Sequence, residues 1–182
     1  PVVAGEHPPA AVLAAQHPGQ LFLALEYVAG VDLWRLHEQV RAAKEFMPLP
    51  LVVALITQAA DGLGAAHRKA ALDGSALNIV HRDVSPHNIM VSYEGEVKVI
   101  DFGIAKSAAV PGGTEPGTLK GKFFYMSPEM IAGHDVDHRA DLFAAGVMLY
   151  EQLCGRRPFT GLNTEEVLSR ISEGKPRRPT EF

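Results

Sequence analysis

Cysteine is nearly absent from this sequence of 182 residues, which contains only Cys154. A single cysteine cannot form an internal disulfide, and it cannot build a metal site from several thiolates. Such usage is typical of proteins from a reducing compartment, so we expect a cytoplasmic location.

Basic charge and long apolar runs are also scarce. The formal net charge is −4 at pH 7, so the composition gives no reason to expect nucleic acid as a partner. Gln58, Asp61, Asp141 and Glu151 interrupt the most apolar stretches, so we expect no membrane-spanning segment. With 47% apolar and 21% charged residues, the chain is typical of a globular protein with one core.

Apolar periodicity and turn residues predict a mixed α+β chain. Helices are expected from the N-cap Asp32 to about Ala43 and at Leu51–Arg68, His138–Leu153 and Thr164–Ser172. Strands are expected at Val2–Gly5, Leu21–Val28, Ile89–Val91 and Val97–Ile100, the last two forming a hairpin. The segments His7–Gln20 and Gly103–Lys122 are rich in turn residues and are expected to be loops.

Two aspartate motifs flank the predicted hairpin. His81-Arg82-Asp83 and then Asn88 precede it, and Asp101-Phe102-Gly103 follows it. A phosphoryl-transfer site needs these residue types in one half of a cleft. Asp83 can accept a proton from an attacking hydroxyl, while Asn88 and Asp101 can hold magnesium on nucleotide phosphates.

Each motif alone is a weak signal, because Asp-Phe-Gly can be an ordinary turn and His-Arg-Asp a surface triplet. In this order, with a hairpin between them, they resemble the eukaryotic-like protein kinases, in the form common among bacterial serine/threonine kinases. The resemblance covers nearly all of the chain. It implies a kinase-like α+β fold, mostly the helical C-lobe with the hinge and one or two N-lobe strands. It also implies ATP and Mg²⁺ as cofactors and proteins as substrates.

The resemblance assigns further residues to nucleotide binding. Glu26 and Val28 correspond to the hinge that meets adenine through backbone groups. Asp32 corresponds to a carboxylate for the ribose hydroxyls, although it can equally serve only as a helix cap. Met90 corresponds to the side chain that packs under adenine, or it is simply a core residue.

Asp141 and Arg82 are assigned supporting roles. A carboxylate in so apolar a helix needs strong hydrogen-bond partners, and the family's aspartate here accepts backbone N–H groups of the catalytic loop. Arg82 corresponds to a cation that faces the activation segment, where a phosphothreonine would supply a counter-charge. Thr114 and Thr118 are the candidates for that modification.

The sequence departs from the family pattern at two positions. Ser85 stands where serine/threonine kinases usually have a lysine that steadies the transferred phosphoryl group, and Lys122 stands where they usually have a threonine. We hypothesise that Lys122 reaches across the site to replace the missing ammonium, while Ser85 supplies the hydroxyl. The alternative is that Lys122 is a solvated loop residue.

Several family features cannot be placed in this sequence: the Gly-rich loop, the phosphate-anchoring lysine and its glutamate partner. We therefore expect residues 1–28 to be a remnant of the N-lobe with the hinge, and residues 29–182 to be an incomplete C-lobe. Such a chain is expected to be inactive on its own. A pseudokinase-type binding module and a small-molecule phosphotransferase of related fold are the alternatives to a serine/threonine kinase.

Overall fold

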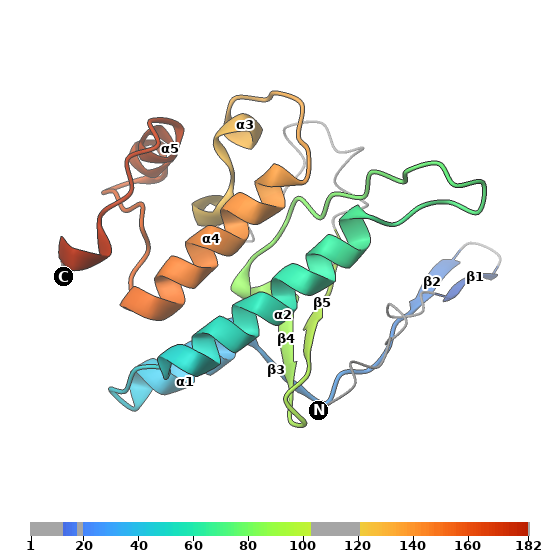
Figure 1. Ribbon diagram of the computed structural model, residues 1–182, viewed down its shortest axis with the longest axis horizontal. Coiled ribbons are helices and arrows are strands. Elements are labelled where there is room, and N and C mark those ends of the chain that lie inside the picture. Colours follow the sequence, from blue (N-terminus) through green and yellow to red (C-terminus); the bar gives the residue numbers. More distant parts are fainter. Residues whose placement is uncertain (1–12, 18–19, 103–120, 182) are drawn as a thin grey trace.

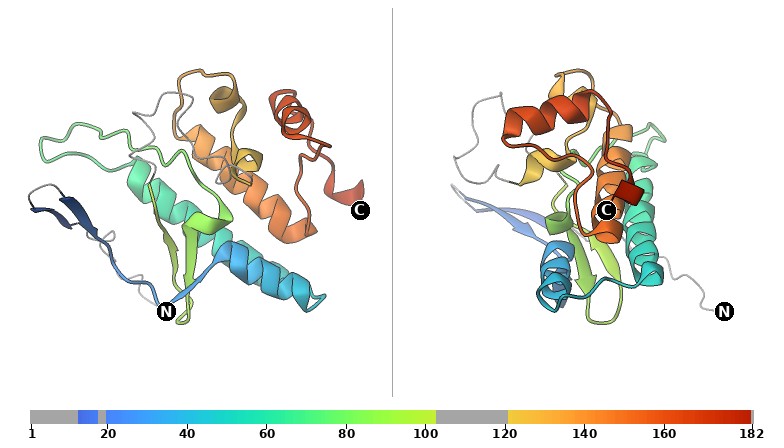
Figure 2. Two further views of the ribbon diagram at one scale, coloured as in Figure 1. Left: turned by 180° about the vertical axis from the view of Figure 1, so that it is seen from behind. Right: turned by 90° about the vertical axis from the view of Figure 1, so that its left-hand side faces the viewer.

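The computed structural model describes residues 13–17, 20–102 and 121–181 (Figure 1). Strands β1 (Leu13–His17) and β2 (Gln20–Ala24) form an antiparallel pair. Strands β3 (Gly30–Asp32), β4 (Ile89–Ser92) and β5 (Val97–Val99) form an antiparallel sheet in the order β3-β4-β5. The two sheets stand apart in Figure 1 and in the left-hand view of Figure 2.

The helices follow the predicted order along the chain. They are α1 (Leu33–Ala42), α2 (Leu49–His67), α3 (Pro128–Ile131), α4 (Arg139–Cys154) and α5 (Thr164–Ser172), with single 3-10 turns η1 (Pro86–Asn88), η3 (Lys122–Tyr125) and η4 (Pro179–Glu181). The four predicted helices are confirmed to within two residues at each end. Asp32 caps α1 as expected, because its Oδ1 accepts the Arg35 N–H at 2.8 Å.

Helices α2 and α4 lie side by side and form the centre of the core (Figures 1 and 2). Helix α2 also contacts β5, so it joins the helical layer to the three-stranded sheet. Its apolar residues recur at helical spacing and give it one buried face: Val52, Leu55, Ile56, Ala59 and Leu63. Helix α4 contributes Ala144, Val147 and Met148 to the same core.

The strand predictions were partly wrong near the N-terminus. The strand expected at Leu21–Val28 ends at Ala24, and β1 lies in a segment expected to be a loop. Neither error had a clear signal in the sequence, since the alanines of β1 give no alternating pattern and its strand conformation depends on pairing with β2. The strand expected at Val2–Gly5 lies outside the described residues.

Strand β3 was not predicted, because it is only three residues long and runs directly into α1. Gly30 allows it to form. A Cβ at this position would overlap the Val91 carbonyl oxygen of β4, so the two backbones approach more closely than any other residue permits.

Helix α2 is long and apolar enough, by length and composition, to cross a membrane. The expectation that no segment is long and apolar enough to span a membrane was therefore wrong, because Gln58 and Asp61 do not outweigh the surrounding apolar residues. A core helix of a soluble protein passes the same test. Val52 and Leu63 are fully buried against the rest of the fold, so one face of α2 belongs to the core.

Replacement of a buried α2 leucine should destabilise the fold strongly. Leu63→Ala is expected to lower the free energy of unfolding by about 2–5 kcal/mol, because it opens a cavity at a fully buried position. Leu51→Ala is the matched control on the same helix, since Leu51 is 43% exposed. Urea unfolding followed by circular dichroism measures both, and equal losses would contradict the described burial.

Candidate active site

The Asp141 carboxylate holds the segment that carries the first aspartate motif. Its Oδ2 accepts the backbone N–H of His81, and its Oδ1 accepts that of Arg82, both at 2.9 Å. The His67 Nε2 lies 2.7 Å from the same Oδ2, so α2 contributes a third contact. Asp141 is 1% exposed, and these partners account for a carboxylate in the core. Its predicted role as a scaffold is confirmed.

Arg82 takes a left-handed backbone conformation, with φ of 61°. A non-glycine residue rarely adopts this conformation without compensating contacts. Its N–H is fixed by Asp141, and the turn directs the chain from His81 towards Asp83. The local strain is therefore offset by the same carboxylate that anchors the loop.

The His81 side chain connects the two aspartate motifs. It is fully buried, its Nδ1 accepts the Asp83 N–H at 3.2 Å, and its Nε2 lies 2.9 Å from the Ile100 carbonyl oxygen. Because Nδ1 acts as the acceptor, the ring proton belongs on Nε2, which donates to that carbonyl. The ring also packs against Phe102, with centroids 4.6 Å apart. The backbones of Asp83 and of Ile100, the residue before Asp101, are thus both hydrogen-bonded to one imidazole.

The expected metal ligands, Asn88 and Asp101, lie at the end of the β4–β5 hairpin that is opposite its turn. The Asn88 Nδ2 donates to the Asp83 carbonyl oxygen at 2.7 Å and to Asp83 Oδ2 at 3.1 Å. The backbone carbonyl oxygen of Asn88 accepts the Ile100 N–H at 2.9 Å. Asp101, the next residue after Ile100, therefore lies beside Asn88. With the amide nitrogen occupied, Asn88 offers its Oδ1, and Asp101 offers an exposed carboxylate. Such oxygen donors suit Mg²⁺, which takes its other ligands from water and phosphate.

Lys122 lies beside Asp83. Its Nζ is 2.7 Å from Asp83 Oδ2, and the two side chains are 34% and 12% exposed. The 3-10 turn η3 positions the lysine, although it lies 39 residues further along the chain. Lys122 is therefore not a solvated loop residue in this structure.

Ser85 does not take part in that contact. Its side chain is 1% exposed, and its Oγ has no hydrogen-bond partner within the described residues. The structure thus places the Lys122 ammonium at Asp83, as the hypothesis requires, but within the described residues it shows no contact through which the Ser85 hydroxyl could replace that of the missing threonine.

The residues expected to bind the nucleotide lie along β3 and the hairpin. Asp32 and Met90 are directly opposed in the register of β3 and β4, so they occupy neighbouring places on the sheet. The Glu26 carboxylate forms an ion pair with Lys98 of β5, and this contact raises the pKa of Lys98. Val28 is half-buried in the segment that connects β2 to β3.

Comparison with known proteins agrees with this arrangement. A family model described as protein kinase domain matches residues 11–178. The chain belongs to the protein kinase family.

Three bacterial protein kinases are similar to the chain. A tyrosine-protein kinase, MasK, from Myxococcus xanthus is 42% identical over 90% of this chain and 25% of its own length. The serine/threonine-protein kinase drp72 of Corynebacterium efficiens is 39% identical over 87% of this chain and 28% of its own length. PknL of Mycobacterium tuberculosis, named a serine/threonine-protein kinase, is 37% identical over 80% of this chain and 33% of its own length. This kinase domain sequence thus spans a third or less of these relatives.

Among the described residues, the guanidinium of Arg82 is partly buried without a hydrogen-bond partner at one of its nitrogens. Its Nε is buried and has no hydrogen-bond partner in the part of the chain that the structure describes. Thr114 and Thr118, the candidate phosphorylation sites, lie outside the described residues. A regulatory pairing between Arg82 and a phosphothreonine stays a prediction.

A second buried carboxylate of the kinase domain was not predicted. Glu151 is 9% exposed, accepts the Tyr125 hydroxyl at Oε2, and accepts the Arg157 Nε–H at Oε1 over 2.9 Å. Burial and the neighbouring carboxylate raise the pKa of the Tyr125 phenol, which therefore remains a donor. The signal was present in the sequence, since Glu151 interrupts an apolar helix just as Asp141 does. Its partners are distant in the chain and could not be identified from spacing.

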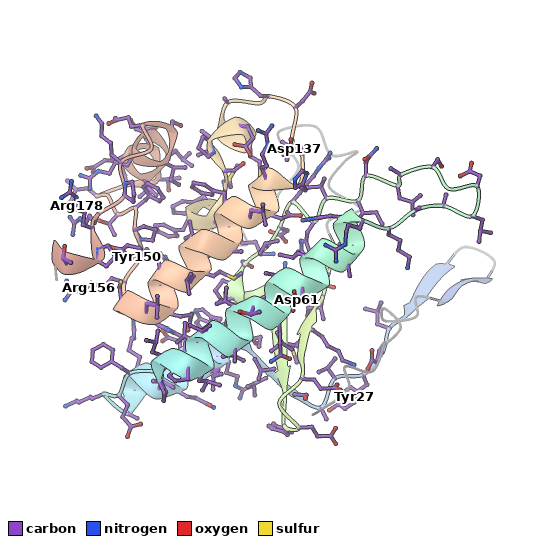
Figure 3. The ribbon with its side chains drawn as sticks, in the orientation of Figure 1. Tyr27, Asp61, Asp137, Tyr150, Arg156 and Arg178 are labelled. Atoms are coloured by element: carbon purple, nitrogen blue, oxygen red, sulfur yellow. The ribbon has the colours of Figure 1, made fainter. Side chains whose placement is uncertain are left out.

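Removal of the Asp141 carboxylate should release the catalytic loop. Asp141→Ala leaves the His81 and Arg82 N–H groups buried without acceptors, which we expect to cost about 2–6 kcal/mol of the free energy of unfolding. Hydrogen exchange of these two amides should accelerate, as followed by NMR. Asp137→Ala is the control, because Asp137 lies just before α4 and its side chain is 49% exposed (Figure 3). Unchanged protection of both amides in Asp141→Ala would contradict the anchoring role.

Proposed function

We propose that this kinase domain, in its complete protein, transfers the γ-phosphoryl group of ATP to serine or threonine hydroxyls of other proteins. The observation that carries the proposal is the shared contact of Asn88 and Lys122 with Asp83 Oδ2. An amide and an ammonium there fix the carboxylate in place and put positive charge beside it. Positioning and charge are what phosphoryl transfer requires from a protein.

Asp83 is the residue we assign to the attacking hydroxyl. A carboxylate within hydrogen-bond reach orients that hydroxyl and accepts its proton as the new P–O bond forms. Asn88 Oδ1 and the Asp101 carboxylate are the groups that would hold Mg²⁺. When bound, the metal neutralises charge on the phosphate oxygens.

Lys122 is assigned to the transferred group. Its ammonium lies against the catalytic carboxylate, on the side of the site formed by η3. Fixed positive charge near developing negative charge on phosphoryl oxygens is worth a few kcal/mol in a preorganised site. This function replaces that of the lysine absent at Ser85.

The nucleotide is assigned to the edge formed by β3 and the preceding segment. Backbone groups of Glu26 and Val28 would meet the adenine edge, and Met90 would pack against its face. Asp32 would serve the ribose hydroxyls. Its Oδ1 already accepts the Arg35 N–H, so the carboxylate would serve both roles through different oxygens or lone pairs.

Tyrosine is the second candidate acceptor, because MasK is named a tyrosine-protein kinase. Against it, Val84-Ser85-Pro86-His87 lacks the Ala-Arg or Arg-Ala run typical of tyrosine kinases at this place. The names of drp72 and PknL also favour serine or threonine.

Acceptor specificity can be measured with the complete gene product. Peptides that differ only in carrying serine, threonine, tyrosine or alanine should be incubated with labelled ATP and magnesium. We expect label on the serine and threonine peptides, and a loss of roughly 10²–10⁴-fold in turnover for Asp83→Asn. Label on the tyrosine peptide alone would assign the chain to the second candidate. No transfer to any hydroxyl would favour a pseudokinase-type binding module.

The role of Lys122 can be separated from that of a general surface charge. Lys122→Ala should lower turnover at least about tenfold, because the transferred group loses one preorganised charge. Lys175→Ala is the matched control, since Lys175 is an exposed lysine paired with Glu173 beyond α5. A loss below tenfold in the Lys122 variant would assign the ammonium a structural role instead.

A further inference from the structure

One ion pair joins the segment that we assign to adenine with the strand that leads to the proposed metal site. The hinge segment, residues 25–29, connects β2 to β3. The carboxylate of Glu26 in this segment contacts the ammonium of Lys98 in β5, although the two residues are 72 positions apart in the chain. Lys98 precedes Asp101 by three residues. The pair therefore connects two parts of the proposed nucleotide site.

The hinge segment lies largely in solvent. Leu25 is 57% exposed, and Tyr27, which is labelled in Figure 3, is 88% exposed. The far end of the segment is held at the turn of the β4–β5 hairpin, where the Tyr93 N–H donates to the Ala29 carbonyl oxygen at 2.9 Å. A segment held near one end can still rotate about its own axis. A second attachment therefore decides where its backbone groups point.

Lys98 provides that attachment from a fixed place in the sheet. It is directly opposite Met90 in the register of β4 and β5, and Met90 is directly opposite Asp32 in the register of β3 and β4. Directly opposed residues point to the same face of a sheet, and neighbouring strands lie about 4.8 Å apart. The stem of Lys98 thus stands one strand away from Met90, which we assign to the face of adenine.

A second carboxylate beside Lys98 offers an internal comparison. Glu96 lies just before β5, and its Oε2 is 3.6 Å from the Lys98 Nζ. The Glu26 and Glu96 side chains are equally exposed, at 40%. A contact with Glu96 stays within the hairpin, whereas the contact with Glu26 crosses to another part of the chain. The two glutamates therefore separate the effect of charge beside Lys98 from the attachment of the hinge segment.

The orientation of the hinge segment has a consequence for base selectivity. Adenine carries an amino donor at the position where guanine carries a carbonyl oxygen. A backbone carbonyl of the segment can accept a hydrogen bond from the first group and is repelled by the second. Hydrogen bonds weaken steeply as donor and acceptor lose alignment. A segment held in one orientation therefore distinguishes the two bases better than a segment that rotates.

We propose that Lys98 is a positioning residue for the nucleotide base, because its ion pair with Glu26 fixes the orientation of the segment that meets adenine. The proposal rests on the proposed kinase function, which supplies the nucleotide. The Glu26 side chain is engaged by Lys98, and its backbone groups are left for the base. Lys98 acts through the hinge segment, so its removal lowers the preference for adenine over guanine and leaves the contacts of Asp83 in place.

The preference can be measured by binding alone. Isothermal titration calorimetry of the complete gene product with ADP and with GDP, each with magnesium, gives the ratio of the two affinities. Lys98→Met removes the ammonium and keeps the stem, while Glu26→Gln removes the carboxylate. Each should lower the preference for ADP about two- to fivefold, the range expected for an exposed ion pair. The double variant should lose no more than either single variant, since both changes remove the same interaction.

Salt and two control variants assign the effect to the ion pair. The preference of the unaltered protein should fall at high salt, whereas that of Lys98→Met should not change. Lys98→Arg keeps a cation within reach of Glu26 and should retain the preference. Glu96→Gln removes the other carboxylate beside Lys98 and should leave the preference unchanged. Unchanged ratios in Lys98→Met and Glu26→Gln, additive losses in the double variant, or an equal loss in Glu96→Gln would overturn the proposal.

Nucleotide binding and phosphoryl transfer can fail separately in these measurements. A lowered preference in the variants of a protein that transfers no phosphoryl group would refute the kinase activity and keep the role of Lys98. Transfer by a protein whose preference does not respond to the variants would refute the role and keep the activity. An unaltered protein that binds neither nucleotide, or binds both equally, would overturn the role of Lys98 together with the adenine site.

Discussion

The bond pattern of Asp141 is the constraint on which the rest of the site depends. A buried carboxylate is costly unless its oxygens are fully occupied, and here two backbone N–H groups and one imidazole occupy them. Those N–H groups belong to the catalytic loop itself. The stability of α4 in the core is therefore tied to the conformation of the residues that carry Asp83.

Glu151 performs a similar task at the other end of the same helix. Asp141 and Glu151 are ten positions apart, which corresponds to about 15 Å of helix. Asp141 holds the loop that bears Asp83, and Glu151 holds η3, which bears Lys122, through Tyr125. One rigid helix thus positions both walls of the site, and the contact between Lys122 and Asp83 forms where these walls meet.

The two carboxylates also show which features of the fold can be predicted from the sequence and which cannot. Helices with strong apolar periodicity, the hairpin and Asp141 were predictable, because their signals are local or lie in motifs with fixed spacing. Strands β1 and β3 were not, since β1 has no alternating apolar pattern and depends on pairing with β2, and β3 is a three-residue strand that pairs with the distant β4. The partners of Glu151 lie 26 residues before it and six after it, and the packing of η3 on α4 brings the distant one, Tyr125, to the carboxylate.

The positions of Lys122 and Ser85 explain why only the lysine of the expected exchange contacts Asp83. A lysine has a long flexible stem, so its ammonium can reach Asp83 from a neighbouring wall. A serine hydroxyl has no such reach, and Ser85 is fixed as the residue before η1, with its Oγ buried away from the contact. Phosphoryl transfer depends mainly on where charge is placed. An ammonium delivered from the opposite wall can meet that requirement without any hydroxyl in exchange.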